Sequence, residues 1–571
     1  MPQVFIDGQP YEFEEGGKLL QFCLDQGIEI PHFCYHPALS VPANCRQCQV
    51  KAGLPARDRA TGELVTDENG LPVINYFPKP QTSCSLDLVD GMVVHTQYDS
   101  EEVAAIQADN LEMMLINHPL DCPICDQAGQ CPLQNQAYKY GPEGSRFEFE
   151  KVHKPKRVQL GPNVVLDAER CINCTRCTRF TAEVTESHQL SIVNRGDKNY
   201  PMTAPGQILD DPYSMNVCDL CPVGALTEDY FRFKARVWEM SKTPSVSDFG
   251  AKGINVDYWV RDNQILRITP RANLDVNEYW MPDAARLVYE RYNENRLQGA
   301  RVNGAAVAWE TAYDEAARVL KDADGSVLFL GSAWATVEDN YLLTKLADTV
   351  GGEVLGYIPY HEEGRGDGWL ISDDRAPNAQ GCERLGIRAL DASLLQSKLA
   401  GASVLYVLDD DPVAAGVLSG ADLEGVTVIL HASHATNETL PHAAVAFPAA
   451  MCVETIGTYV NEAGRAQRLR PAKMIRSMNR SLMMAMGTGQ SRIDRGGTPF
   501  DRWHDVTNKV DCLPGWTVIP ELADRLGRPM HYKGPERVMD ELAETNPAFT
   551  GATYPAMDLL GVALEDIGEP A

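Results

Sequence analysis

Thirteen of the sixteen cysteines of this 571-residue chain lie before residue 222, and this clustering limits what its first half can be. Disulfides at that density would need a secretory route. The opening residues, MPQVFIDGQPYEF, contain neither the basic nor the apolar segment of a signal peptide. In a reducing compartment, grouped cysteines indicate bound metal. We therefore expect a cytoplasmic protein whose N-terminal part holds metal through thiolates.

Length and charge narrow the class of protein further. A chain of 571 residues is too long for a single core, so several units are expected. No stretch approaches the roughly 20 apolar residues of a membrane-spanning helix. The net charge of −28 argues against binding to nucleic acid, which requires a cationic surface. The same charge could steer the chain toward basic partner surfaces.

The first group of cysteines combines a long spacing, a close pair and a remote fourth member. Its members are Cys34, Cys45, Cys48 and Cys84. Iron–sulfur clusters need thiolates that converge on one pocket, and one loop with a distant partner achieves this. The pattern favours a [2Fe–2S] site, and a structural zinc site is the alternative.

The second group places a histidine ahead of three cysteines within the stretch HPLDCPICDQAGQC. Its members are His118, Cys122, Cys125 and Cys131. A lone histidine before proline is usually a surface or capping residue, but three spaced thiols beside it favour a ligand. A neutral imidazole binds both iron and zinc, so zinc held by three thiolates and one imidazole is again the alternative.

The third group resembles the bacterial ferredoxin signature, in which three close cysteines are completed by a remote Cys-Pro. Its members are Cys171, Cys174, Cys177 and Cys221. Cys218 could compete with Cys221, and the proline that follows Cys221 favours the latter. Twelve ligands thus form three complete sets. Three clusters on one chain predict a conduit for single electrons.

Local patterns predict a small mixed domain at the start of the chain. Residues 4–7 and 11–14 alternate as two short strands joined by the turn Asp7-Gly8, and residues 18–27 have helical spacing. Strand, strand, helix and a cysteine-bearing loop is the order of a plant-type ferredoxin. Cys23 lies among apolar residues of this helix and is expected in the core.

A further helix is expected at residues 99–116, where Asp99 or Ser100 can cap the first turn. Its packing stripe is expected to consist of Val103, Ile106, Met114 and Leu115.

Cysteines become scarce after about residue 235, and the pattern changes. Residues 254–260 and 264–270 are strand-like, and an α/β alternation begins at about residue 325. Its apolar strand candidates are 326–333, 403–411 and 426–433. The glycine-rich stretch 486–499 predicts a mobile loop.

Together these motifs resemble the large iron–sulfur subunit of respiratory complex I (NADH-quinone oxidoreductase), which is the 75 kDa subunit in mitochondria. PHFCYHP with ANCRQCQV is similar to that family's [2Fe–2S] loop, and NHPLDCPICDQAGQCPLQ to its segment of one histidine and three cysteines. DAERCINCTRCTRF with VCDLCPVGALT resembles its second [4Fe–4S] site, and RITPRANLDVNEYWMPDAARLVYE a small domain shared with molybdopterin oxidoreductases. The resemblance is strong over residues 1–295 and weaker beyond.

The resemblance implies one [2Fe–2S] cluster in the first group and one [4Fe–4S] cluster in each of the other two, with iron held by the same twelve residues. Such a subunit relays electrons toward quinone and has no complete catalytic site of its own. Its implied partners are the flavin/NADH-binding subunit, the small [2Fe–2S] subunit and the quinone-proximal iron–sulfur subunits. It would lie peripherally on the cytoplasmic side of the inner membrane, without a membrane span.

The sequence departs from the family in two places. Some bacterial members carry a further four-cysteine cluster soon after residue 230, but the corresponding stretch here contains no cysteine. We therefore expect three clusters. The gap between Cys48 and Cys84 is longer than in the mitochondrial pattern, which affects the geometry of that loop.

The expected fold is a multidomain chain of α+β and α/β parts. The parts are a plant-ferredoxin-like β-grasp domain (1–98), the segment with one His and three Cys ligands (99–140), a [4Fe–4S] ferredoxin-like domain (141–237), a small molybdopterin-oxidoreductase-type β-rich domain (238–297) and a reduced molybdopterin-oxidoreductase-like α/β region (298–571).

The last region is expected to bind no cofactor. Cys382, Cys452 and Cys512 are the only candidate molybdenum ligands there, and we interpret them as buried structural cysteines. No dinucleotide fingerprint or phosphate-binding loop stands out, so no molybdopterin, FMN or NAD is expected on this chain. The acidic runs LDDDP and LDVNE are interpreted as solvated surface.

Two other classes of protein share parts of these patterns. An electron-transfer subunit of a soluble NAD-linked hydrogenase or formate dehydrogenase would share the first 230 or so residues. The scarcity of later cysteines disfavours the catalytic domains that such enzymes need. A zinc-binding scaffold is the non-redox alternative, and iron with acid-labile sulfide would distinguish it.

Overall fold

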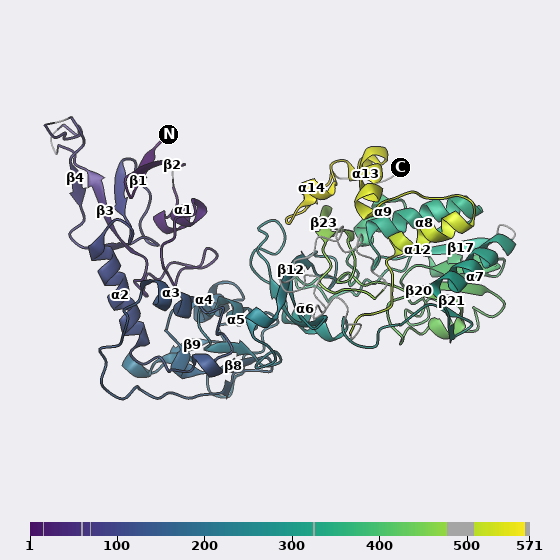
Figure 1. Ribbon diagram of the computed structural model, residues 1–571, viewed down its shortest axis with the longest axis horizontal. Coiled ribbons are helices and arrows are strands. Elements are labelled where there is room, and N and C mark those ends of the chain that lie inside the picture. The colour runs from purple at the N-terminus through teal and green to yellow at the C-terminus, as the bar shows by residue number, and fades with distance from the viewer. Residues whose placement is uncertain (15, 59–60, 69, 324–325, 477–507, 566–571) are drawn as a thin grey trace, which may run out of the picture. The chain divides into compact units, whose positions relative to one another are not determined.

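The computed structural model describes all residues except 15, 59–60, 69, 324–325, 477–507 and 566–571. The chain divides into two compact units, Met1–Trp238 and Glu239–Ala571 (Figure 1). The finer division into five parts stays a prediction. The glycine-rich stretch 486–499 lies outside the described residues.

The N-terminal unit begins with a six-stranded sheet in the order β2-β1-β6-β3-β4, with β5 paired to β3. Its strands are β1 Gln3–Ile6, β2 Gln9–Glu12, β3 Gln49–Pro55, β4 Ile74–Tyr76, β5 Gln81–Thr82 and β6 Met92–His95. The turn Asp7-Gly8 joins β1 to β2 with φ angles of 49° and 78°, as a tight hairpin requires. Helix α1 (Leu19–Asp25) buries Cys23 in the core beneath this sheet. The expected order of strand, strand and helix is confirmed.

Helix α2 (Glu101–Leu115) differs from expectation in the face that it buries. Ser100 caps it, because its hydroxyl accepts a hydrogen bond from the Val103 backbone. The buried residues are Val103, Gln107 and Leu111, whereas Ile106, Met114 and Leu115 are only partly buried. Gln107 is tolerated inside because its amide donates to the Gln49 carbonyl at 3.0 Å. The expected stripe is therefore wrong in part: a polar partner on β3 decides the face.

The rest of the N-terminal unit consists of short elements around the second and third cysteine groups. Its helices are η1 Cys122–Ile124, α3 Pro132–Tyr140, η2 Ala168–Arg170, α4 Arg176–Glu183 and α5 Asn216–Leu220. Strands β7 Val158–Gln159, β8 Val164–Leu166 and β11 Leu226–Glu228 form one small sheet, and β9 Ser191–Val193 pairs with β10 Tyr200–Met202.

The C-terminal unit contains a seven-stranded sheet in the order β16-β15-β21-β20-β19-β17-β18. Its strands are β15 Arg301–Val302, β16 Ala305–Ala306, β17 Val327–Gly331, β18 Glu353–Tyr357, β19 Val404–Val407, β20 Thr427–Ala432 and β21 Ala443–Pro448. The five strands from β21 to β18 are parallel. The α/β pattern expected from about residue 325 is thus confirmed.

Two smaller sheets and several helices complete this unit. The small sheets are β12 Ser241–Val246, β13 Asn255–Arg261 and β14 Gln264–Pro270, and β22 Gly457–Val460, β23 Arg465–Leu469 and β24 Val562–Ala563. The helices include α6 Asp283–Leu287, α7 Trp309–Asp322, α8 Val337–Val350, α9 Ala379–Arg384, α10 Ala392–Leu399, α12 Gly515–Arg525, α13 Pro535–Thr545 and α14 Tyr554–Met557.

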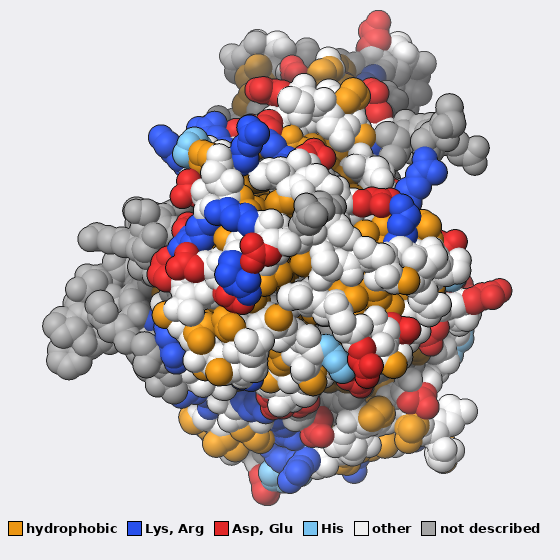
Figure 2. Space-filling model, turned by 90° about the vertical axis from the view of Figure 1, so that its right-hand side faces the viewer, with side chains coloured by type: hydrophobic (Ala, Val, Ile, Leu, Met, Phe, Trp, Pro, Cys, Tyr) orange, Lys and Arg blue, Asp and Glu red, His pale blue; other side chains and the backbone are white. Residues whose placement is uncertain are grey.

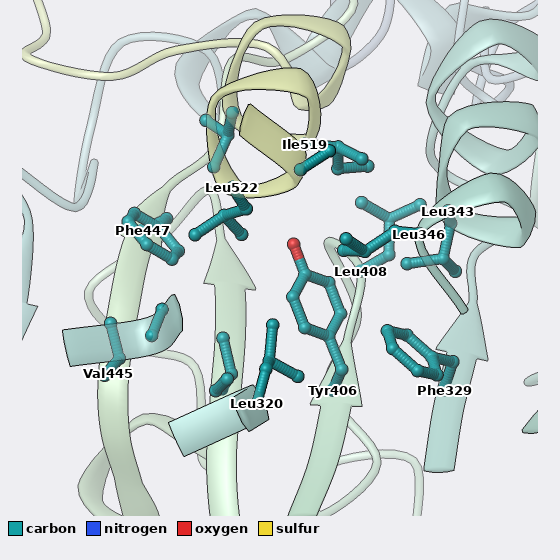
Figure 3. Packing of buried hydrophobic residues seen from close by; sticks show 14 of the residues in the cluster. Leu320, Phe329, Leu343, Leu346, Tyr406, Leu408, Val445, Phe447, Ile519 and Leu522 are labelled. Carbon is teal, nitrogen blue, oxygen red and sulfur yellow. The ribbon is translucent and has the colours of Figure 1, made fainter. Parts of the chain in front are cut away.

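The parallel strands are apolar throughout because both faces of the sheet are covered. Along β17, Phe329 points to one buried cluster, while Leu328 and Leu330 point to the other. Figure 3 shows the first cluster, where Tyr406 of β19 extends between residues of α8 and α12. This alternation fixes the register of each strand, since a slip by one residue would exchange the two faces.

Surface charges are mixed on the face of the C-terminal unit shown in Figure 2, where Lys and Arg side chains lie among Asp and Glu side chains. Among the described residues, no helix has both the length and the apolar character needed to cross a bilayer.

One buried histidine makes the stability of the C-terminal unit depend on pH. His431 of β20 is 1 % exposed, and its Nε2 lies 2.6 Å from the Tyr406 hydroxyl. Burial lowers its pKa from 6.5 to about 3. Between these values the unfolded chain binds a proton that the folded chain excludes, so the stability contributed by neutral His431 is complete above the unfolded pKa and is lost as pH falls.

We therefore expect wild type to lose about 2 kcal/mol of unfolding free energy relative to His431→Gln between about pH 8 and pH 5. Urea denaturation at the two pH values measures this difference. His531→Gln, at an exposed position, is the matched control and should show none of it. An equal pH response of wild type and His431→Gln would contradict the assignment.

Candidate functional site

The four cysteines of the first group converge in the N-terminal unit. Cys34, Cys45 and Cys48 lie in loops before β3, and Cys84 follows β5. The loop bends sharply at Ala43 and Arg46, whose φ angles of 49° and 54° are left-handed. Hydrogen bonds from the Cys45 and Cys84 thiols lower the pKa of Cys34, and a hydrogen bond from Cys84 lowers that of Cys48. The fourth cysteine thus returns to the loop despite the long gap.

The three cysteines of the second group are placed by short helical turns. Cys122 begins η1, Cys125 follows it, and Cys131 precedes α3. Burial raises the pKa of the Cys131 thiol to about 11, and the neighbouring Cys125 adds to this effect. Cys122 is exposed, whereas Cys125 and Cys131 are buried.

His118 follows α2 and is suited to bind a metal ion. Burial, with smaller contributions from Arg170 and Lys151, lowers its pKa to about 4, so the ring is neutral at pH 7. Its Nδ1 is buried without a hydrogen-bond partner among the described residues. An orphaned buried nitrogen of this kind fits a ligand atom. The ring also lines a cleft of about 520 Å³ with Cys45 and Cys171.

The four cysteines of the third group line one small cavity. Cys171 follows η2, Cys177 lies in the first turn of α4, and Cys221 ends α5. Left-handed residues at Asn173 (φ 54°) and Thr175 (φ 62°) fold the intervening loop around the cavity. Burial and the neighbouring thiols raise the pKa of Cys177 well above its ordinary value.

Cys221 and Cys218 differ in their surroundings. Cys221 lines the cavity, and backbone N–H groups of Val223, Leu226 and Ala225 hydrogen-bond to its sulfur and oppose the rise in its pKa. Cys218 lies on the buried part of α5 and is not among the described residues that line this cavity.

The second and third groups meet at the segment from Cys221 to Gly224. The Cys131 thiol lies 3.6 Å from the Pro222 carbonyl oxygen. A Cβ atom on Gly224 would lie 2.2 Å from the sulfur of Cys125, so only glycine permits this approach. One short stretch of backbone therefore separates the two candidate sites.

The first and third groups are joined by two arginines of α4. Arg179 Nη2 donates to the Cys34 carbonyl at 2.5 Å and to the Cys174 carbonyl at 3.5 Å. Arg176 donates to the carbonyls of Tyr35 and Leu220. The third group consequently contacts both of the others. Sequence reasoning did not single out Gly224 or these arginines, although both arginines lie within the motif RCTRF.

The donor sets fit iron–sulfur clusters in their chemistry. Backbone N–H groups point at the sulfurs, as from Asn173 to Cys171 at 3.4 Å, and such bonds stabilise thiolates and tune cluster potentials. The described residues contain no group of three His, Cys, Asp or Glu side chains arranged to hold a metal ion. The assignment of ligands stays a prediction.

Family models match all three groups. A "2Fe-2S iron-sulfur cluster binding domain" covers residues 2–99, the "NADH-ubiquinone oxidoreductase-G iron-sulfur binding region" covers 107–146, and the "NADH-quinone oxidoreductase subunit 3, ferredoxin-like domain" covers 161–227. Each cysteine group lies wholly inside one of these matches.

Whole-chain comparisons agree with the family models. The chain is 36 % identical over 358 residues to the NADH-quinone oxidoreductase-G protein of Rickettsia felis, covering 62 % of this chain and 49 % of that protein. It is related to the 75 kDa family of complex I iron–sulfur subunits. The NADH-ubiquinone oxidoreductase 75 kDa subunit of Reclinomonas americana is 38 % identical over 336 residues, covering 58 % of this chain and 45 % of that one.

A relative from Thermus thermophilus, named NADH-quinone oxidoreductase subunit 3, is 36 % identical over 365 residues, covering 61 % of this chain and 46 % of that protein. The aligned part thus spans about half the length of these curated relatives. Among solved structures, a chain of an NAD+-reducing [NiFe]-hydrogenase in the H2-reduced state matches with a TM-score of 0.33 and 26 % identity, over 41 % of this chain and 91 % of that one.

A fourth family model, the "NADH-ubiquinone oxidoreductase NDSU1/NuoG-like, 4Fe-4S domain", matches residues 240–290. That stretch contains no cysteine, so it offers no thiolate for a further cluster. The remaining cysteines of the C-terminal unit, Cys382, Cys452 and Cys512, are 0 %, 5 % and 0 % exposed. Burial raises the pKa of each thiol well above its ordinary value, as expected of neutral structural cysteines.

Proposed function

We propose that this chain is an iron–sulfur electron-transfer subunit of a proton-pumping NADH:quinone oxidoreductase, relaying electrons from the NADH/FMN module toward quinone. One observation carries the proposal: each of the three ligand groups falls inside its own iron–sulfur family match, in chain order. Single electrons need several closely spaced centres, and the three groups share backbone contacts.

The twelve residues of the three groups would hold one [2Fe–2S] and two [4Fe–4S] clusters. When bound, these clusters supply reversible one-electron transfer. The chain's own residues position the ligands, exclude water from the buried thiols and stabilise thiolates with backbone N–H groups. His118 supplies a neutral ligand where the other positions supply anions.

The contacts between groups support an order along the relay. The third group contacts the first through Arg179 and the second through the Pro222 carbonyl. The order first, third, second follows from these contacts. Arg176 and Arg179 also place positive charge beside the third group, since both oppose the rise in the pKa of Cys174 that burial causes. Such a charge favours the reduced state of a nearby centre.

The partners and location follow from the same proposal. The chain would lie between the flavin/NADH-binding subunit with its small [2Fe–2S] companion and the quinone-proximal iron–sulfur subunits, on the cytoplasmic side of the inner membrane. The C-terminal unit would be a reduced molybdopterin-oxidoreductase-type α/β region, and this chain would carry no molybdopterin, FMN or NAD.

Cys131→Ala tests the relay. Because Cys131 would hold one [4Fe–4S] cluster alone, the variant should lose one [4Fe–4S] signal in EPR spectra of the reduced, anaerobically purified complex. The [2Fe–2S] signal should remain and serves as the internal control. Iron and acid-labile sulfide should fall by the content of one cluster.

Two outcomes would contradict the proposal. Retention of every EPR signal in Cys131→Ala would remove the second group from the relay. Zinc in place of iron and inorganic sulfide in the wild-type protein would make the chain a structural scaffold instead.

A further inference from the structure

A cleft of about 670 Å³ opens in the C-terminal unit, away from all three cysteine groups. It lies where β17 and β19 end, since Trp334 follows β17 and Asp409 to Asp411 follow β19. The chain leaves β17 toward β18 on one side and returns at β19 on the other. Open parallel sheets bind ligands at such a switch point, in the crevice beyond the carboxyl ends of the strands.

The cleft carries more negative than positive side chains. Its carboxylates are Asp248, Glu290, Glu294, Asp409, Asp410 and Asp411. Two arginines, Arg291 and Arg375, also line it. Arg291 is already committed, because it forms an ion pair with Asp248 and lies 5.5 Å over the ring of Trp334. The cleft therefore attracts cations.

The histidine of the cleft adds no positive charge. His434 Nε2 lies 3.0 Å from the Arg291 carbonyl, to which it donates, and its Nδ1 lies 3.0 Å from the Ser433 hydroxyl. Burial lowers the pKa of this ring, which keeps it neutral. Asp411 is fixed structurally, since it accepts hydrogen bonds from the backbones of Glu438 and Thr439.

Asp410 is the side chain that points to a ligand. It is 5 % exposed, and its Oδ1 accepts hydrogen bonds from the Tyr360 hydroxyl and the Asp411 backbone. Its Oδ2 is buried with no hydrogen-bond partner among the described residues. The nearby Ser332 hydroxyl donates to the Asp409 carbonyl at 3.0 Å, so it does not satisfy this oxygen. A buried carboxylate oxygen without a donor is costly in free energy.

Two further features fit a bound organic molecule. Trp334 and Tyr360 line the cleft with ring centroids 5.5 Å apart in an edge-to-face pair, which offers an apolar surface. Asp409 has a left-handed φ of 38°, a strained conformation of the kind found at ligand sites. The volume suits a small molecule rather than a bare ion.

We propose that this cleft binds a small organic cation, whose ammonium group donates to Asp410 Oδ2 while its organic body lies against Trp334 and Tyr360. This is a binding function in the C-terminal unit, separate from electron transfer. It also reverses the interpretation of LDDDP as solvated surface: Asp410 is buried, and Asp409 and Asp411 are partly buried.

Isothermal titration of the full-length chain with three amine probes tests the proposal. The probes are tyramine, spermidine and arginine methyl ester, and 3-(4-hydroxyphenyl)propionate is an anion matched to tyramine. Burial raises the pKa of Asp409 to about 6 and of Asp410 to about 7, so titrations belong at about pH 8, where both are ionised. We expect at least one amine to bind and the matched anion not to bind.

Asp410→Asn should weaken amine binding by roughly tenfold or more, because it removes the charge and keeps an oxygen for Tyr360. Asp409→Asn is a second variant, since asparagine tolerates the left-handed backbone, and it should weaken binding less. Asp524→Asn, at an exposed position of α12, is the matched control and should leave binding unchanged.

Three outcomes would overturn the proposal. They are the absence of binding for all three amines, equal binding of the matched anion, and unchanged amine affinity in folded Asp410→Asn. Binding of Mg²⁺ or Ca²⁺ alone, with no amine bound, would assign the cleft to a metal ion and also overturn it. Loss of an iron–sulfur signal plays no part in the readout, so the result stands apart from the relay.

Discussion

Cys221→Ala is expected to eliminate one [4Fe–4S] signal completely, whereas Cys218→Ala should keep all three clusters. Cys221 lines the cavity of the third group and receives hydrogen bonds from three backbone N–H groups at its sulfur. A cluster with one of four thiolates missing loses both a ligand and the charge that balances iron. The change should therefore be a loss of signal rather than a shift.

EPR spectra of the two variants, reduced under the same conditions, measure this difference, and iron analysis checks the cluster count. Cys218→Ala is the matched control because Cys218 is a buried cysteine only three residues away. The reverse result, loss in Cys218→Ala with retention in Cys221→Ala, would transfer the ligand role to Cys218. Loss in both would mean that the fold of α5, rather than one sulfur, holds the site.

Glu454→Gln should destabilise the C-terminal unit by about 3–5 kcal/mol, the cost of breaking a buried ion pair. Glu454 is 0 % and Arg296 2 % exposed at the side chain, and their charged atoms lie 2.7 Å apart. Lys473 lies 3.9 Å from the same carboxylate oxygen. The variant leaves two buried cations without their anion.

The pH dependence of this pair has a defined sign. Burial opposes ionisation of Glu454, but Arg296 and Lys473 outweigh it and lower its pKa below the ordinary value. The pair therefore stabilises the folded state at neutral pH, and this contribution is lost as pH falls through the acid range. The effect of Glu454→Gln should shrink at low pH.

Urea denaturation of the full chain, followed through the transition of the C-terminal unit, gives the change in unfolding free energy. Glu438→Gln, at an exposed position, is the control and should change it by less than about 0.5 kcal/mol. A midpoint for Glu454→Gln equal to that of the control would show that the pair contributes no net stability.

Local patterns in the sequence were sufficient for the elements whose causes are local. The hairpin at Asp7-Gly8 follows from turn chemistry, and the parallel strands around Phe329 and Tyr406 follow from continuous apolar runs. The spacing of the cysteines likewise predicted the three groups.

Contacts between distant residues could not be predicted in this way. Gln107 is buried because its amide meets the Gln49 carbonyl, a contact across 58 residues. Asp410 is buried because β19 ends inside the sheet's crevice, where the order of strands rather than composition decides exposure. In both cases a polar residue is placed inside by a partner or a topology that periodicity does not reveal.

The contacts that join the candidate sites belong to the same category. Arg179 reaches Cys34 across 145 residues, and the Cys131 thiol reaches Pro222 across 91. Each ligand group is recognisable alone, but the adjacency of groups emerges only when the chain is folded.

The approach of Gly224 to Cys125 has a consequence for how this protein can change. Cys221 and Gly224 are joined by three peptide bonds, so the wall of one pocket is also part of the wall of the other. Separation between the second and third pockets is set by covalent geometry instead of by side-chain packing. Thermal motion of the surrounding domains cannot stretch that interval, and a substitution that shifts this strip relocates both pockets together.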